Sequence, residues 1–306
     1  MTYDLVGIGN PVYDLISTPR TTTSQRILSG CSTNACLAAK RLGMQDVMLV
    51  GNVGVDFAQR FLGEVGQYGI KAVNTGTSSK TTGFSLKYDE HGDRTLRVIA
   101  DAGKIPLGRV WQEVSNARYL LLGPVLYEID TVEVARLAPT ARGEVFLDPQ
   151  GLLRKLDKNG EVQHFCNREE LRKLVAAVDF VKPNELEALI ITGSQDHVES
   201  AKQLVGWGAR IAIVTLGEKG SIVCDQQNCL RIPAYKTTAI DPTGAGDVYA
   251  GAFLAEYSRN RDLAAACLYA SAAASIMVEN VGPDFPVTDE SVRRRVRLIE
   301  SELEVL

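Results

Sequence analysis

The stretch "AIDPTGAGDVYAGAFLAEY", residues 239–257, decides the fold of this chain and indicates its chemistry. Gly244 and Gly246 flank Ala245, and Asp247 follows at once. Small and apolar residues then recur in a pattern typical of a helix, so the two glycines lie at or just before a helix start. Unpaired amide groups and the positive end of the helix dipole bind anions at such a position.

Asp247 falls in the first turn of this predicted helix, where the dipole stabilises a carboxylate. A carboxylate beside an anion pocket suits the transfer of a phosphoryl group to an alcohol, because it can take the proton of the attacking hydroxyl. The plainer alternative is a tight turn followed by an acidic residue that caps the helix. The chain has no Gly-x-x-x-x-Gly-Lys-Ser/Thr pattern, so a P-loop is excluded.

Composition narrows the class of protein. The 306 residues are 45% hydrophobic and 23% charged, which is typical of a globular chain that forms one large α/β domain. A net charge of -4 gives no basic surface for nucleic acid, and no apolar run is long enough to span a membrane. The start "MTYDLVGIGN" lacks a secretion signal, and six cysteines without a Cys-x-x-Cys pair indicate neither zinc nor a disulfide framework. We therefore expect a cytoplasmic protein with reduced thiols.

Buried strands alternate with helices along most of the chain. Short apolar runs predict strands at 4–9, 47–51, 118–122, 144–148, 178–181 and 211–215. Helical patterns lie between them at 33–43, 56–68, 131–141, 168–176, 185–192 and 196–208, and three more follow at 244–258, 261–279 and 288–303. This alternation predicts a single α/β domain over 1–306, with a mostly parallel sheet covered on both faces.

Two segments break the alternation. Residues 81–99, "TTGFSLKYDEHGDRTLRVI", have two strand-like runs around "DEHGD", which is typical of a hairpin. Residues 16–28 are polar and rich in threonine, which indicates a further extended strand. We predict that both segments form a small β-strand lid over the α/β body.

The string Asp241 to Asp247, "DPTGAGD", followed by Tyr249 and Gly251, resembles the signature of the ribokinase-like (PfkB) family of carbohydrate and nucleoside kinases. The resemblance implies a three-layer α/β/α fold with a lid, and ATP-dependent phosphorylation of a hydroxyl group. It implies that Asp247 is the catalytic base, while the amides of Gly244, Ala245 and Gly246 hold the charge on the transferring phosphate. Pro242 stands where the family usually has threonine, at a position that is neither base nor amide donor.

The resemblance extends to a substrate side near the start of the chain. "GIGNPVYDLI", 7–16, is similar to the family's first strand and loop, which implies that Asp14 grips substrate hydroxyls. "SGCSTNACLAAKRLG", 29–43, resembles the family's Gly-Gly-x-x-x-Asn-x-Ala stretch, which implies substrate contacts by Gly30 and Asn34. Ser29 replaces the first glycine of that pair. The alternatives are a turn aspartate and an asparagine that caps a helix.

The nucleotide side resembles the family at three further places. "KPNELEAL", 182–189, matches its Asn-x-x-Glu element, which implies that Asn184 and Glu187 place magnesium and phosphates, partly through water. The alternative for this pair is simply a helix start. "IVTLGEKGSIV", 213–223, implies that Thr215 and Gly217 lie by the phosphates with Gly220 in the turn. The resemblance also implies that Ser271 lies beside adenine, and that the backbone at Asp241 and Gly282 binds potassium as in many relatives.

The identity of the alcohol stays open between a sugar, a nucleoside and a cyclitol. "LDPQGLLR", 147–154, resembles a stretch of inositol-kinase-type and archaeal members, and predicts that Gln150 and Arg154 face the substrate region. Relatives often pair two lids in a homodimer, so we expect one here. Two other functions remain open: a nucleotide-binding pseudokinase without catalysis, and a hydroxymethyl-pyrimidine or pyridoxal-type kinase.

Overall fold

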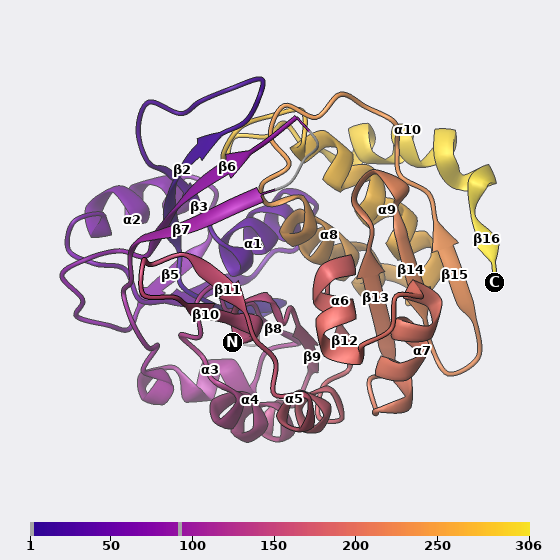
Figure 1. Cartoon of the computed structure of the whole chain (residues 1–306), viewed down its shortest axis with the longest axis horizontal. Helices are drawn as coiled ribbons and strands as arrows, with labels where there is room; N and C mark the ends of the chain where they lie inside the picture. Colours follow the sequence, from indigo (N-terminus) through magenta and orange to yellow (C-terminus); the bar gives the residue numbers. More distant parts are fainter. Residues whose placement is uncertain (1–2, 91–93) are drawn as a thin grey trace.

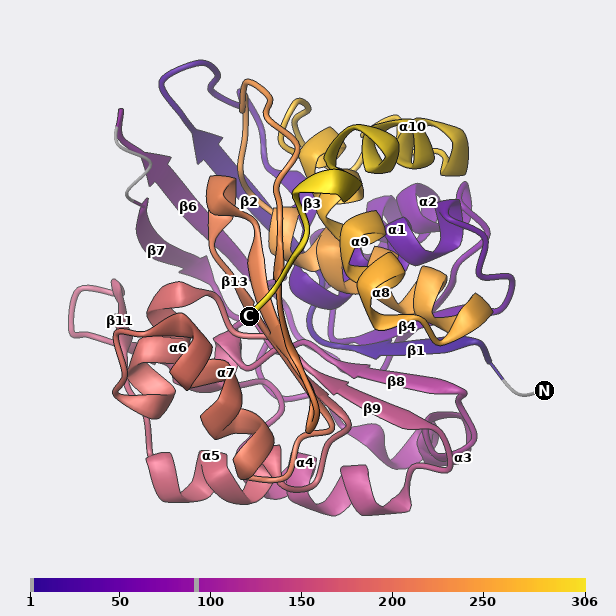
Figure 2. The same cartoon turned by 90° about the vertical axis from the view of Figure 1, so that its right-hand side faces the viewer.

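A ten-stranded sheet runs through the centre of the computed structural model, which describes residues 3–90 and 94–306 (Figures 1 and 2). From one edge the order is β16 (Glu304–Val305), β15 (Cys229–Ile232), β14 (Ser221–Cys224), β13 (Ile211–Thr215), β12 (Phe180–Val181), β9 (Glu144–Leu147), β8 (Tyr119–Leu122), β1 (Leu5–Ile8), β4 (Val47–Gly51) and β5 (Lys71–Asn74). Neighbours run parallel from β13 to β5, and β14, β15 and β16 add an antiparallel edge. The fold is therefore the predicted α/β type, and the carboxyl ends of its parallel strands share one edge.

Helices cover both faces of this sheet (Figure 2). One face packs against α1 (Cys31–Arg41), α2 (Ala58–Gly66), α8 (Ala245–Asn260), α9 (Leu263–Met277) and α10 (Asp289–Ile299). The other packs against α3 (Trp111–Ser115), α4 (Thr131–Leu137), α5 (Arg168–Val175), α6 (Glu185–Thr192) and α7 (His197–Gly206). Alternation along β1 shows the reason: Leu5 lies in the first core, while Val6 and Ile8 lie in the second.

A separate four-stranded sheet projects from the body as the lid (Figures 1 and 2). Its order is β3 (Ile27–Ser29), β2 (Val12–Ser17), β6 (Gly83–Tyr88) and β7 (Arg94–Ala100). Segment 81–99 contains β6 and β7, and part of its predicted turn, 91–93, lies outside the described residues. Segment 16–28 is mostly the connection between β2 and β3. The strand begins earlier because Val12 and Ile16 pack with Phe84 in a small lid core, which places Asp14 within a lid strand.

Several short helices and strands were not predicted: α3, β5, β14, β15, β16 and a hairpin of β10 (Arg154–Leu156) and β11 (Val162–His164). All are five residues or shorter, so they leave little periodicity in the sequence. Among the helices that the structure describes, none has both the length and the apolar character needed to cross a bilayer.

One cysteine pair corrects the expectation of reduced thiols. Cys224 in β14 and Cys229 in β15 face each other in register and form a disulfide. Their spacing of five residues spans a hairpin turn, which a search for Cys-x-x-Cys pairs does not detect. Cys31, Cys36, Cys166 and Cys267 are free thiols.

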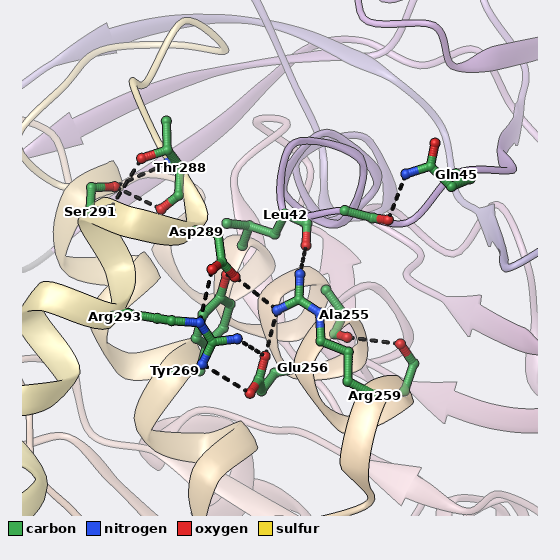
Figure 3. Close-up of polar contacts among 12 residues, drawn as sticks. Leu42, Gln45, Ala255, Glu256, Arg259, Tyr269, Thr288, Asp289, Ser291 and Arg293 are labelled. Carbon is green, nitrogen blue, oxygen red and sulfur yellow. Dashed lines mark hydrogen bonds and ion pairs between the residues drawn. The ribbon is translucent and has the colours of Figure 1, made fainter.

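A polar network joins the three C-terminal helices (Figure 3). The Glu256 carboxylate on α8 is buried and accepts from Arg259 Nη1 at 2.6 Å and from Arg293 Nη2 of α10 at 2.9 Å. Asp289 on α10 accepts from Arg259 at 2.9 Å and from the Tyr269 hydroxyl of α9 at 2.7 Å. These contacts fix the orientation of α8, whose other end begins at Ala245.

Candidate active site

The first turn of α8 follows a glycine and has backbone amides without acceptors. Gly244 precedes the helix at φ 83°, and a Cβ there would lie 2.6 Å from Asn34 Nδ2. The first helical bond runs from Val248 N to Gly244 O at 2.9 Å, so the amides of Gly246 and Asp247 lie before it without a helical acceptor. Within residues 3–90 and 94–306, no side chain caps this end. The amides are therefore free for an anion.

Helix α1 begins in the same way and meets α8 at its start. Its cap is Gly30, at φ 118°, where a Cβ would lie 3.0 Å from Asn10 O, and again no described side chain caps the helix. By contrast, α4, α5, α6, α7, α9 and α10 all have a capping side chain, while the shorter α2 and α3 also have none. Asn34 Nδ2 donates to Asp247 Oδ2 at 3.0 Å, which brings the two uncapped ends together.

Asp247 is partly buried and is held by neutral donors. Besides the bond from Asn34, Gln150 Nε2 donates to Asp247 Oδ1 at 3.3 Å. Arg154 Nη2 donates to Gln150 Oε1 at 2.7 Å, and since a guanidinium can only donate, the Gln150 amide group is turned toward Asp247. Burial raises the pKa of Asp247, and the Asp148 carboxylate adds to the rise, while Asn34 and Lys182 oppose it. The carboxylate is thus suited to accepting a proton.

The predicted substrate residues lie close to Asp247, and Asn34 bonds to it directly. Asp14 is 3% exposed and its Oδ1 accepts from Phe84 N at 2.8 Å. Burial raises the pKa of Asp14 to about 7, against the Phe84 amide and the charges of Arg26 and Arg154. The Ser29 hydroxyl also opposes the rise in the pKa of Asp14, and Asn34 Nδ2 donates to Ser29 Oγ at 3.4 Å. Ser29 therefore lies between the two sides, a position that was not predicted for it.

A buried ion pair beside Asp247 was also missed by the sequence analysis. Lys182 Nζ lies 2.8 Å from Asp148 Oδ2, and both side chains are less than 5% exposed. Ligand atoms of Asp148, Asp247 and Cys31 lie within 4.8 Å of one another. The available signal was a charged residue at the end of each of two predicted strands, Asp148 as the last residue of 144–148 and Lys182 directly after 178–181, because parallel neighbours end at the same edge.

Asn184 and Glu187 form a capping box at the start of α6. The Asn184 side chain accepts from Glu187 N at 2.9 Å, and Glu187 Oε2 accepts from Asn184 N at 2.9 Å. The helix-start alternative is therefore what the structure displays. Glu187 is also buried, and burial followed by Asp148 raises its pKa. Glu187 and Asp148 are thus two carboxyl groups near the uncapped end of α8. They fit a magnesium ion, which takes few protein oxygens and several waters.

The remaining nucleotide-side residues lie along β13, its turn and α9. Thr215 ends β13 and bridges to Asn184, and Gly217 follows at φ 58°. Gly220 has φ 86°, and a Cβ there would lie 1.9 Å from Ile232 O, so this turn requires glycine. The Ser271 hydroxyl donates to Pro233 O at 2.6 Å, so it holds the segment after β15.

Asp241 is fully buried in the loop before α8. Its Oδ1 accepts from Thr243 N at 2.9 Å. Its Oδ2 is buried and has no hydrogen-bond partner among the described residues. An unpaired buried carboxylate oxygen fits a nearby cation.

The lid contacts the same loop from two strands. The Tyr88 hydroxyl at the end of β6 lies 3.1 Å from Thr243 Oγ1. The Thr18 hydroxyl, just after β2, donates to Ile240 O at 2.9 Å. These contacts tie the lid to the segment that carries the free amides.

Comparison with known proteins gives a consistent family. The profile of the pfkB family carbohydrate kinases matches residues 5–290. The chain is 32% identical over 271 residues to a cytidine kinase of Thermococcus kodakarensis, with 85% of this chain and 90% of that protein covered. It is 27% identical over 302 residues to a deoxyribokinase of Salmonella typhi, with 91% and 94% covered.

Solved structures share the fold at lower identity. A pyrophosphate-dependent kinase in the ribokinase family superposes with a TM-score of 0.81 at 20% identity, covering 94% of this chain and 99% of the other. Ribokinase from Thermotoga maritima gives 0.76 at 21% identity, covering 96% and 99%. With the profile match over nearly the whole length, the chain belongs to the PfkB family of carbohydrate kinases.

Proposed function

We propose that this kinase transfers the γ-phosphoryl group of ATP to a hydroxyl of a small polyhydroxylated substrate, with Asp247 as general base. The observation that carries the proposal is a carboxylate held by the neutral Asn34 and Gln150 side chains, directly beside the free amides at the start of α8. The amides of Gly244, Ala245 and Gly246 stabilise charge on the phosphoryl group as it moves, although the Ala245 amide donates to Pro242 O at 3.3 Å without phosphate. The hydroxyl proton passes to Asp247.

The acceptor lies between the lid and α1 in this proposal. Asp14 accepts hydrogen bonds from two neighbouring hydroxyls, and the backbone at Gly30 and the Asn34 amide bond further groups. The bonds from the Asn34 amide to Ser29 and to Asp247, with the effect of Ser29 on the pKa of Asp14, support a single acceptor site that reaches Asp247. Gln150 bonds to the other oxygen of Asp247 and Arg154 bonds to Gln150, so both limit the shape of the acceptor.

A nucleoside is the acceptor that we place first. The relative named cytidine kinase has the highest identity among those described above and matches over 90% of its length. Deoxyribokinase and ribokinase relatives keep a free sugar as the second candidate. All of these acceptors present vicinal or primary hydroxyls of a pentose, which suits a carboxylate that accepts two bonds.

ATP lies at the carboxyl end of β13 and the amino end of β14 in this proposal, near Asn184, Thr215, Gly217 and Gly220, with Ser271 shaping the adenine side through Pro233. Glu187 holds magnesium through water, and this ion neutralises phosphate charge when bound. The unpaired Asp241 oxygen supports a potassium ion at the adjacent backbone. The exposed outer face of the lid, with Leu15 and Ile99 at 36% and 42% exposure, supports a homodimer through two lids.

A panel of acceptors tests the function. Cytidine, other nucleosides, ribose, deoxyribose and myo-inositol are each incubated with the protein, magnesium and ATP, and inorganic pyrophosphate replaces ATP in a parallel set. We expect ATP-dependent phosphorylation of at least one pentose-containing acceptor, with a nucleoside the best. Absence of any phosphorylated product, together with tight ATP binding, would instead favour the non-catalytic reading.

A further inference from the structure

The buried Lys182–Asp148 ion pair has no part in the function proposed so far. Lys182 follows β12 and Asp148 follows β9, which are adjacent parallel strands paired at Val181 and Leu147. The pair therefore lies at the carboxyl edge of the sheet, where ligands of open α/β sheets bind. Its two side chains are 4% and 3% exposed, and burying two charges costs free energy that a plain core would not require.

The Lys182 ammonium lies against the anion-binding segment. A Cβ built on Gly246 would be 3.3 Å from Lys182 Nζ, so the ammonium occupies the space that a side chain at position 246 would enter. Gly246 is also the residue whose amide lies free in the first turn of α8. Lys182 Nζ and the Gly246 amide are thus neighbouring donors on one site.

The ammonium has spare donors. It carries three N–H groups, and within the described chain its ion-pair partner is Asp148 alone, at 2.8 Å. A buried N–H that is left unpaired is costly, so a ligand with several acceptor oxygens suits this position. The phosphoryl group bound at the Gly246 amide is such a ligand.

We propose that Lys182 is a further catalytic residue, whose ammonium contacts the phosphoryl group during transfer beside the Gly246 amide. This inference rests on the proposed function. The bond between the γ-phosphorus and the β–γ bridging oxygen breaks, a bond from the substrate oxygen to phosphorus forms, and the hydroxyl proton goes to Asp247. ADP leaves, and Lys182 keeps its proton throughout because its role is electrostatic.

Asp148 anchors the ammonium in this arrangement. The acidic neighbours Asp148 and Cys31, with the carboxyl of Glu187, also face Lys182 and raise its pKa against the effect of burial. The cation is therefore retained in the absence of phosphate. Removing Lys182 alone leaves Asp148 buried without its partner, which predicts a loss of stability as well as of activity.

Lys182 also lowers the pKa of the base Asp247. The pH–rate profile therefore responds to Lys182 in a way that a purely structural role would not produce. The charged or titratable groups that face Asp247 are Asp148 after β9, Lys182 after β12, Cys31 on α1, Arg94 on β7 and Arg154 on β10. Among them Asp148 raises and Lys182 lowers the pKa of Asp247. Loss of Lys182 alone therefore shifts the acid limb of the rate profile to higher pH.

Three variants separate these effects: Lys182→Met, the double variant Asp148→Asn/Lys182→Met, and the control Lys173→Met on the exposed surface of α5. The double variant removes both charges, so its folding and its acid limb return toward wild type. Its kcat on the pH plateau stays about 100–1000-fold below wild type, which is typical for loss of one electrostatic donor in a transition state. Lys173→Met, whose side chain is 73% exposed, keeps wild-type kcat.

The assays use the acceptor that the panel identifies, with thermal unfolding and ATP binding measured on the same samples. A double variant that regains at least a tenth of wild-type kcat would show that Lys182 serves only to balance Asp148, and would overturn this inference alone. A wild-type protein that phosphorylates no acceptor overturns the proposed function and this inference with it. A low kcat in a double variant that folds and binds ATP supports the direct contact.

Discussion

The two ends of α8 carry two carboxylates with opposite surroundings. Glu256 lies near the C-terminal end and is paired with two guanidinium groups, Arg259 and Arg293 (Figure 3). Asp247 lies in the first turn and accepts from two neutral amides, while the nearest ammonium is already paired with Asp148. A carboxylate whose oxygens are taken up by cations serves to hold helices together. A carboxylate held by neutral donors, with a raised pKa, is suited to chemistry.

The largest expected effect is on Asp247→Asn. A general base supplies about 100–10,000-fold, so kcat should fall at least about 100-fold while the protein folds and binds ATP. Asparagine keeps the size of the side chain, and no ion pair is lost. Steady-state kinetics and thermal unfolding of the same preparation measure both properties. Turnover near wild type in this variant would remove Asp247 from the mechanism.

The second effect concerns pH and Asp14. Its pKa of about 7 means that the carboxylate forms only as the pH rises through neutrality, so kcat/KM for the acceptor should fall below pH 7. Asp14→Asn removes charge-assisted bonds of about 1.5–3 kcal/mol each, which predicts a loss of about 10–1000-fold in kcat/KM. That acid limb should disappear with it, and the KM for ATP should stay unchanged. An unaltered profile would exclude Asp14 from acceptor binding.

Asp14 also has a stability counterpart with a defined sign. A carboxyl whose folded pKa is raised contributes stability that is fully present below its unfolded pKa of about 3.9 and is lost as the pH rises through about 7. Asp14→Asn should therefore be at least as stable as wild type at pH 8. Urea unfolding at pH 5 and pH 8 measures the difference. A higher stability of the variant at pH 8 would show that burying the ionised Asp14 carboxylate lowers the free energy of unfolding of the wild type.

The third effect is the opposite of the first, because we expect a loss of stability with no loss of kcat. Glu256→Gln weakens two charge-assisted contacts, but Arg259 and Arg293 are 36% and 44% exposed and can be hydrated. The free energy of unfolding should fall by about 1–3 kcal/mol, with kcat per folded molecule unchanged. Glu169→Gln, which breaks an exposed pair with Lys173 on α5, should change it by less than about 0.5 kcal/mol. Loss of kcat at full stability in Glu256→Gln would contradict the distinction between the two ends.

The sequence predicted the parts of the site that local chemistry determines. Gly244 and Gly246 followed by Asp247 indicate a free helix start whatever the rest of the fold, and the alternation of strands and helices predicts the parallel sheet. The family resemblance added Asp14 and Asn34, which the structure brings into one connected set with Asp247.

The missed residues depend on contacts between distant segments. Lys182 and Asp148 become a pair only when β12 is placed next to β9, and that order is not encoded in either segment alone. Ser29 looked like a simple departure from a glycine pair until the lid strand brought Asp14 to it. The Cys224–Cys229 disulfide likewise depends on hairpin register. Such contacts follow from strand order and register, which periodicity does not specify.

The smallest effect tests the double role of Glu187 in α6. Glutamine can still accept from Asn184 N, so Glu187→Gln should keep the capping box and the stability of the helix. It loses the charge that orients magnesium-bound water, so the magnesium concentration for half-maximal rate should rise about tenfold, with a smaller change in the KM for the acceptor. Glu185→Gln is the matched control, because Glu185 lies exposed in the same first turn and interacts with the same helix dipole. An equal rise in the magnesium requirement of both variants would assign the effect to the helix dipole. Glu187 would then only cap α6, and its role would be structural, like that of Glu256.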